Sequence, residues 1–223
     1  TAARKKFFNR SKNIWIRCWG ARVTTAAASM VNEEVIRRFT KLMACERLAH
    51  AYLFVGPSGC GKVETAYAVA TLVNCESSSD RPCGSCGSCV KIASGNHPDI
   101  LFYEQAEELS IKIQKVRELI ERIQLRPYEA RRKVVIIKNA EALTTEGANA
   151  LLKTLEEPTA SSLLILTTAV PERILDTVKS RCHAVPFFGL SRSALCARLE
   201  TQDGLLPREA AVLSGYADGC YGK

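Results

Sequence analysis

The residues from Gly56 to Lys62 have the types and spacing of a phosphate-binding loop, G-x-x-x-x-G-K. In such a loop the glycines let backbone N–H groups close around a phosphate, the lysine meets the terminal phosphates, and a following Ser or Thr holds Mg²⁺. Here Val63 follows the lysine and has no oxygen to offer a metal, and Glu64 adds a negative charge. The sequence therefore predicts a degenerate nucleotide site. Its candidate residues in this loop are Gly56, Gly59, Gly61, Lys62 and Val63.

A second chemical signal is a cluster of four cysteines separated by seven, two and two residues. Four thiolates complete a tetrahedral zinc site, and a site closed by four protein ligands is structural rather than catalytic. An iron–sulfur cluster uses similar spacing and is the alternative metal. We expect His97 to belong to the following loop with Pro98 and Asp99, because four sulfurs already complete the site. The predicted ligands are Cys75, Cys83, Cys86 and Cys89.

The composition excludes several classes of protein. The chain has 223 residues, ten cysteines and a net charge of +8. Residues 1–29 hold seven of the 31 basic residues and no acidic one, so the remainder has 24 basic against 23 acidic residues and gives no argument for a large nucleic-acid-binding face. No secretory signal and no apolar run long enough to cross a bilayer are visible, so we expect a reducing compartment and no membrane partner.

The first 29 residues show no countable helical or strand period. We interpret them as a disordered tail, or as upstream sequence translated ahead of a start at Met30. A basic arm for nucleic acid and an organelle-targeting segment are the alternatives, because the segment is acid-free and contains arginine.

Apolar runs and amphipathic stretches alternate along the rest of the chain, which predicts an α/β domain with a mainly parallel sheet. Ligands of such sheets bind at the carboxyl ends of the strands. The basic run 131–133 is interpreted as a solvated turn, with a DNA-backbone contact as the alternative. The expected strands are 51–55, 100–103, 133–137, 163–168 and 184–187. The expected helices are 31–48, 62–73, 111–123, 144–156, 171–179, 191–200 and 207–215.

Five separated motifs, taken together, resemble the bacterial DNA polymerase III clamp loader, a family of the AAA+ superfamily, over roughly residues 31–220. They are His50–Lys62, the four-cysteine segment, Gly95–Asp99, Ala148–Pro158 and Ser180–Cys182. The resemblance implies a RecA-like AAA+ domain at 30–188 with its zinc module at 75–89. It also implies a small helical lid, present only in part at 189–223, and a collar domain that is missing from this sequence.

The resemblance also implies that the ATP site of this chain lacks its catalytic residues. In the family's active ATPases the strand before Ala140 ends in acidic residues that hold Mg²⁺ and polarise water. This chain has Lys138 and Asn139 there. A lysine cannot coordinate a metal and an asparagine cannot act as a base. Thr167 stands where active relatives sense the γ-phosphate, or it merely finishes a strand. We expect no hydrolysis by this chain, and weak nucleotide binding without turnover stays open.

Arg181 lies in the motif whose arginine, in the family, reaches the γ-phosphate in the neighbouring subunit. The resemblance therefore implies a trans arginine finger, which stabilises charge during phosphoryl transfer. From the residues alone, Arg181 is an ordinary surface arginine near the C-terminus of a helix.

A chain that lacks its own catalysis but keeps the arginine finger resembles the family's delta-prime type. This type is a stator that helps to load a sliding clamp for DNA replication. The implied partners are gamma/tau-type ATPase subunits and the delta subunit in a hetero-pentamer, with the clamp and primed DNA met through the complex, in the bacterial cytoplasm. The alternatives are an active gamma/tau-type ATPase and a zinc-dependent interaction module outside replication.

Overall fold

The computed structural model describes residues 30–78, 81–104 and 113–222, so the expectations for residues 1–29 lie outside the described residues. The chain divides into two compact units. Among the described residues, the first unit contains 30–37, 58–78, 81–97 and 188–222, and the second contains 38–57, 98–104 and 113–187. None of the helices described combines the length and apolar character that crossing a bilayer requires.

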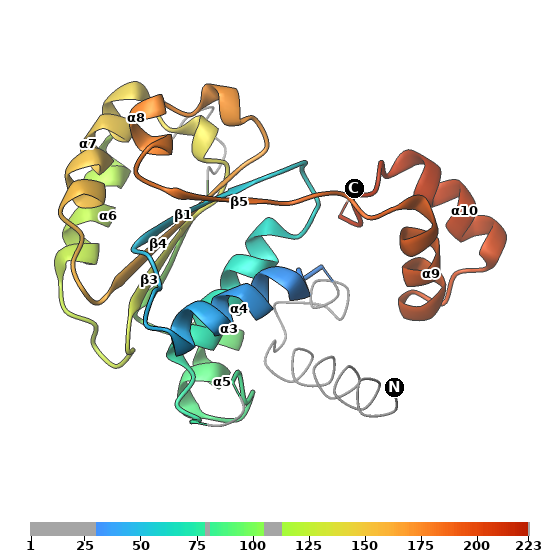
Figure 1. Ribbon diagram of the computed structural model, residues 1–223, viewed down its shortest axis with the longest axis horizontal. Coiled ribbons are helices and arrows are strands. Elements are labelled where there is room, and N and C mark those ends of the chain that lie inside the picture. Colours follow the sequence, from blue (N-terminus) through green and yellow to red (C-terminus); the bar gives the residue numbers. More distant parts are fainter. Residues whose placement is uncertain (1–29, 79–80, 105–112, 223) are drawn as a thin grey trace. The chain divides into compact units, whose positions relative to one another are not determined.

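The second unit is built on a five-stranded parallel sheet in the order β2-β3-β4-β1-β5 (Figure 1). Every residue of β3 and β4 is buried. Parallel strands covered on both faces read as nearly continuous apolar runs, and the predicted α/β fold with a parallel sheet is confirmed. The strands are β1 (Ala51–Val55), β2 (Ile100–Tyr103), β3 (Lys133–Ile137), β4 (Ser162–Thr168) and β5 (His183–Pro186).

Two amphipathic helices, α6 (Ile113–Gln124) and α7 (Thr145–Glu156), bury their apolar sides in one cluster with alternate residues of the strands. The alternation follows from the two-residue period of a strand. At the start of α7, Thr144 Oγ1 accepts a hydrogen bond from the Gly147 N–H at 3.1 Å, which satisfies a donor that the helix itself cannot pair. The predicted helix start at residue 111 lies outside the described residues.

The predicted helix 171–179 is wrong. The segment forms a 3₁₀ turn, η2 (Pro171–Arg173), and a short helix, α8 (Asp176–Lys179), with extended backbone at Ile174 and Leu175 between them. Ile174 is 6% exposed and packs in the core cluster. A β-branched side chain favours extended backbone over helix, so its burial and its local preference agree. A second 3₁₀ turn, η1 (Ala140–Ala142), follows β3.

The first unit contains α4 (Lys62–Asn74), α5 (Gly87–Ala93), α9 (Arg192–Gln202) and α10 (Pro207–Tyr216). Helix α3 (Glu33–Ala44) begins in this unit and is shorter than the predicted 31–48. Asn32 Oδ1 accepts hydrogen bonds from the N–H groups of Glu34 and Val35 at 3.1 and 3.2 Å, as expected of a helix-capping residue. Helix α5, inside the cysteine segment, was not predicted.

Candidate functional site

The glycine loop leaves β1 and enters α4 with a backbone that only glycine accommodates. Gly61 has a φ of 82°, and a Cβ there would lie 1.9 Å from the carbonyl oxygen of Met30. Gly56 approaches the residue that follows β5, since a Cβ there would lie 2.3 Å from the carbonyl oxygen of Phe187. Both glycines are therefore required by close backbone approach, with or without a nucleotide.

Lys62 is only 7% exposed, and its Nζ lies 3.8 Å from the sulfur of Cys60. Burial raises the pKa of the Cys60 thiol, and the lysine charge opposes that rise. The backbone of the loop has a further contact in the same unit, since the Gly222 N–H donates to the Gly59 carbonyl at 3.0 Å. The residue after the lysine, Val63, lies in the first turn of α4, and its side chain has no oxygen.

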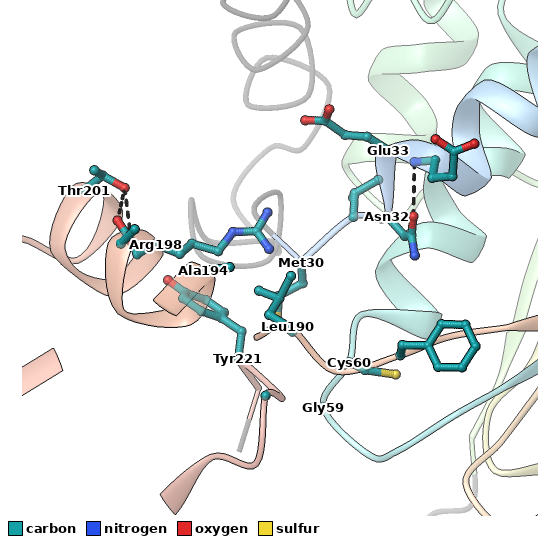
Figure 2. Close-up of a pocket in the computed structure, with 15 residues that line it drawn as sticks. Met30, Asn32, Glu33, Gly59, Cys60, Leu190, Ala194, Arg198, Thr201 and Tyr221 are labelled. Carbon is teal, nitrogen blue, oxygen red and sulfur yellow. Dashed lines mark hydrogen bonds between the residues drawn. The ribbon is translucent and has the colours of Figure 1, made fainter. Parts of the chain in front are cut away.

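A cavity of about 530 Å³ lies within the first unit, beside Gly59 and Cys60 (Figure 2). The start of α3 and one side of α9 line it. Arg198 extends from α9 along this cavity, with its guanidinium carbon 5.8 Å from the centre of the Tyr221 ring. Burial lowers the pKa of Arg198, and the charges of Tyr221 and Glu33 oppose that change. The cavity thus combines apolar walls with one arginine and the acidic start of a helix.

The strand-end residues expected for an ATP site come together in the second unit. Lys138 follows β3 and forms an ion pair with Glu104, which follows β2. The Asn139 N–H donates to Thr167 Oγ1 at 3.3 Å, and Thr167 is 1% exposed. Lys138, Asn139 and Thr167 therefore share the carboxyl edge of the sheet, while Gly59 to Val63 belong to the other unit.

Sequence reasoning missed two carboxylates at this edge. Glu104 neutralises Lys138, and nothing in its sequence position signals that contact. Glu141 accepts a hydrogen bond from the Ala169 N–H at 3.2 Å through Oε1, while its Oε2 is buried without a hydrogen-bond partner in the described part of the chain. The groups assembled at this edge are therefore the ammonium of Lys138 paired with the Glu104 carboxylate, the side-chain amide of Asn139, and the Glu141 carboxylate.

The four predicted cysteines do converge. Their sulfur atoms all lie within 4.8 Å of one another. Zinc–sulfur bonds of 2.3 Å in a tetrahedron place sulfurs about 3.8 Å apart, so the arrangement fits a zinc ion. The converging sulfurs are those of Cys75, Cys83, Cys86 and Cys89.

Backbone N–H groups donate to three of these sulfurs. The Cys83 N–H donates to Cys75 at 3.3 Å, that of Cys86 to Cys83 at 3.4 Å, and that of Cys89 to Cys86 at 3.4 Å. Burial raises the pKa of Cys75 to about 12. Burial also opposes ionisation of Cys83, but hydrogen bonds from the backbone of Ser85 and Cys86 outweigh it and lower the pKa of Cys83 to about 6. Such donors stabilise the thiolates that a metal requires.

His97 lies outside the sulfur cluster but is connected to its helix. The group of candidate metal ligands among the described residues contains the four cysteines and not this histidine. His97 is 4% exposed, and its Nε2 lies 3.1 Å from Ser88 Oγ. The Ser88 N–H donates to Glu76 Oε1 at 3.0 Å. His97 and Glu76 therefore both contact Ser88, the residue of α5 that precedes Cys89.

Arg181 follows α8 and folds back on its own unit. Its Nη2 lies 2.6 Å from Glu156 Oε1, at the end of α7, and its Nη1 donates to the Thr177 carbonyl at 2.8 Å. The contact with Thr177 is the helix-end interaction expected of an ordinary surface arginine. The side chain is still 34% exposed, so the guanidinium remains within reach of another molecule.

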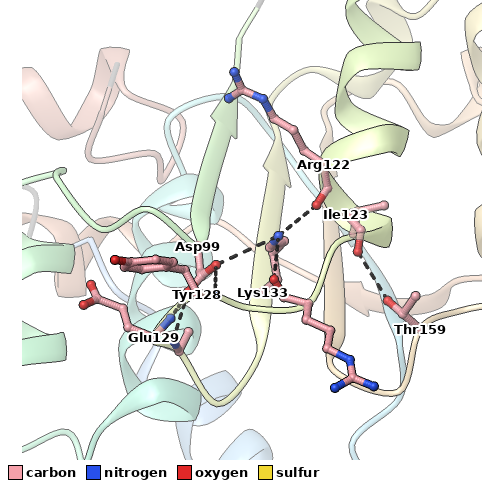
Figure 3. Close-up of polar contacts among 9 residues, drawn as sticks. Asp99, Arg122, Ile123, Tyr128, Glu129, Lys133 and Thr159 are labelled. Atoms are coloured by element: carbon pink, nitrogen blue, oxygen red, sulfur yellow. Dashed lines mark hydrogen bonds and ion pairs between the residues drawn. The ribbon is translucent and has the colours of Figure 1, made fainter.

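The interpretation of the basic run 131–133 as a solvated turn is wrong for Lys133, which is 6% exposed and begins β3. Its Nζ donates to the Arg122 carbonyl at 2.9 Å and lies 4.0 Å from Asp99 Oδ1 (Figure 3). Asp99 also accepts three backbone N–H groups, from residues 128, 129 and 130, at 2.8, 2.9 and 2.9 Å. Burial would raise the pKa of Asp99, but these donors and the lysine lower it.

The parallel sheet carries a glycine loop between β1, which lies between β4 and β5, and the following helix. These features define an α/β protein of the P-loop, RecA-like type. A solved structure of a Thermotoga maritima RuvB variant supports this fold assignment, with a TM-score of 0.56 over 86% of this chain and 57% of that one, at 14% identity. The chain belongs to the family described as DNA polymerase III, delta subunit, whose model matches residues 31–191.

Two curated relatives refine the comparison. The chain is 41% identical over 173 residues to DNA polymerase III subunit delta' of Bacillus subtilis, covering 78% of this chain. It is 37% identical over 182 residues to DNA polymerase III subunit gamma/tau of Mycobacterium tuberculosis (strain H37Rv), covering 80% of this chain. The chain spans 52% of the length of the first relative and 32% of the second.

Proposed function

We propose that this chain is a delta-prime-type subunit of a bacterial clamp loader, a complex that loads a sliding clamp onto primed DNA for replication. The family membership and the 41% identity to a delta' subunit support the proposal. Gamma/tau-type ATPase subunits and the delta subunit would be its partners, and the bacterial cytoplasm its place of action. Residues 30–188 would form the AAA+ domain and 189–223 part of its lid.

The observation that carries the proposal is Lys138 at the end of β3, ion-paired with Glu104. An ATPase needs a carboxylate there to hold Mg²⁺. An ammonium repels the metal, and its pairing with Glu104 removes that carboxylate from metal binding as well. Val63 adds no oxygen and Asn139 adds no base. The chain would therefore not hydrolyse ATP, and its loop at Gly56–Lys62 would serve the fold.

Arg181 would act on ATP held by the neighbouring subunit. Its partial exposure and its place next to the helix end support this role. A guanidinium supplied in trans stabilises charge that develops on the transferred phosphoryl group. The chain would thus contribute to hydrolysis without a working site of its own.

The four cysteines would hold one structural Zn²⁺. A closed tetrathiolate leaves no open position for a substrate, so the ion would stabilise the segment between α4 and β2. The N–H groups that donate to the sulfurs and the contacts of Ser88 with His97 and Glu76 would orient the ligands.

Two ATPase measurements test the proposal. The isolated chain, mixed with labelled ATP and Mg²⁺, should show no turnover. Turnover that is lost on Lys62→Ala would instead make the chain a gamma/tau-type ATPase. Its 37% identity to such a subunit is the reason for this alternative. In a complex reconstituted with gamma/tau-type and delta subunits, Arg181→Ala should lower ATP turnover while gel filtration shows unchanged assembly. Arg173→Ala is a matched control, because Arg173 is also exposed and precedes α8.

A further inference from the structure

Glu156 and Arg181 meet although they belong to separate elements. Glu156 is the last residue of α7, and Arg181 follows α8, with all of β4 between them in the chain. Their ion pair, at 2.6 Å, joins side chains that are 51% and 34% exposed. An exposed ion pair of this kind adds little to stability, because water and salt screen it. The ion pair matters more for the orientation of the Arg181 guanidinium than for stability.

Arg181 makes its three contacts through the two terminal nitrogens of its guanidinium. Nη2 meets Glu156, while Nη1 meets the Thr177 carbonyl at 2.8 Å and Ser180 Oγ at 3.3 Å. A guanidinium has five N–H donors in a fixed plane. The N–H on Nε and the second one on Nη2 are not used by these three contacts. The group can therefore keep its intramolecular contacts and still donate to an external oxygen.

We propose that Glu156 is a positioning residue for Arg181. An arginine held in one orientation before it meets a phosphate loses less conformational freedom on binding than a mobile one. Glu156 supplies the charged half of that restraint and the Thr177 carbonyl supplies the other. This inference rests on the proposed role of Arg181 in trans.

The test uses the reconstituted complex and a double-mutant cycle. Glu156→Ala should lower the ATP turnover number by about two- to tenfold, the range expected from ordering one arginine side chain, with KM for ATP nearly unchanged. Glu156→Gln keeps an oxygen acceptor and should restore part of the loss. Glu157→Ala is the matched control, because it removes the neighbouring exposed carboxylate and leaves the ion pair intact.

The double variant Glu156→Ala/Arg181→Ala tells whether Glu156 acts through Arg181. If it does, adding Glu156→Ala to the Arg181→Ala variant should change turnover no further. A further fall in the double variant, an increase in turnover, or an unchanged Glu156→Ala complex would overturn the positioning role while the arginine finger stands. If Arg181→Ala alone leaves turnover unchanged, the proposed finger fails and the positioning role fails with it.

Discussion

Removal of the Asp99 carboxylate should be among the most damaging single changes in the second unit. Asp99 is 2% exposed and accepts three backbone N–H groups from residues 128–130. It also lies 4.0 Å from Nζ of Lys133, whose side chain is 8% exposed. Asp99→Ala leaves this ammonium without its counter-charge, and breaking a buried pair in this way costs about 3–5 kcal/mol. At about 2–4 °C per kcal/mol for a chain of this size, the melting temperature should fall by roughly 6–20 °C.

Urea unfolding of the full chain measures the change, with Glu121→Ala as the control, because Glu121 is an exposed carboxylate on α6. Asp99→Asn should cost less than Asp99→Ala. Its single oxygen can replace Oδ2 and keep the donors of Glu129 and Ala130, while its NH₂ group faces the Tyr128 donor. A loss below 1 kcal/mol for Asp99→Ala, close to that of the control, would refute the reasoning.

The pH dependence of the same variant gives an independent check. The pKa of Asp99 is lower in the folded protein than its ordinary value. The carboxylate therefore contributes stability that is present above the unfolded pKa of about 3.9 and is lost as the pH falls through the lower folded pKa. The difference in unfolding free energy between wild type and Asp99→Ala should be at its full value at pH 7. It should shrink as the pH falls below the pKa of this aspartate in the unfolded chain.

Two further predictions concern the metal module and the loop. The purified chain should contain one zinc per molecule by elemental analysis. Its removal by a chelator should lower the melting temperature by about 5–10 °C, and a protein free of zinc and equally stable would contradict the assignment. Gly56→Ala should destabilise the chain by about 1–3 kcal/mol in urea unfolding, because the new methyl group would lie 2.3 Å from the Phe187 carbonyl oxygen. Gly87→Ala, whose methyl group would lie 3.6 Å from Glu76 Oε1, should change stability much less.

The centre of the sheet could be predicted from the sequence because β3 and β4 are buried along their whole length. Strands β3 and β4 read as unbroken apolar runs, and the structure has them within one residue of the expected bounds. The cysteine cluster was equally readable, since thiol spacing alone carries the signal. Helix α5 was not, because it has seven residues, is rich in small side chains and begins at a capping cysteine. Local propensity does not reveal so short a helix, because an isolated helix of this length is unstable without contacts to the rest of the protein.

The polar contacts were the least predictable part. Lys133 reads as one more charge in a basic run, yet it is buried because Asp99 and two carbonyl oxygens receive it. The pairs formed by Lys138 with Glu104 and by Arg181 with Glu156 likewise join residues far apart in the chain. No periodicity marks such partners, because the fold rather than local spacing brings them together.

Two glycines of the phosphate-binding loop are required by the fold itself. Gly56 and Gly61 are held by the carbonyls of Phe187 and Met30, so a population of variants selected only for folding would still keep both glycines. The backbone at Val63 is ordinary α-helix, so its conformation does not require a particular residue there. The glycines of a phosphate-binding signature can therefore persist under selection for folding alone, whereas the position after its lysine is free of that restraint.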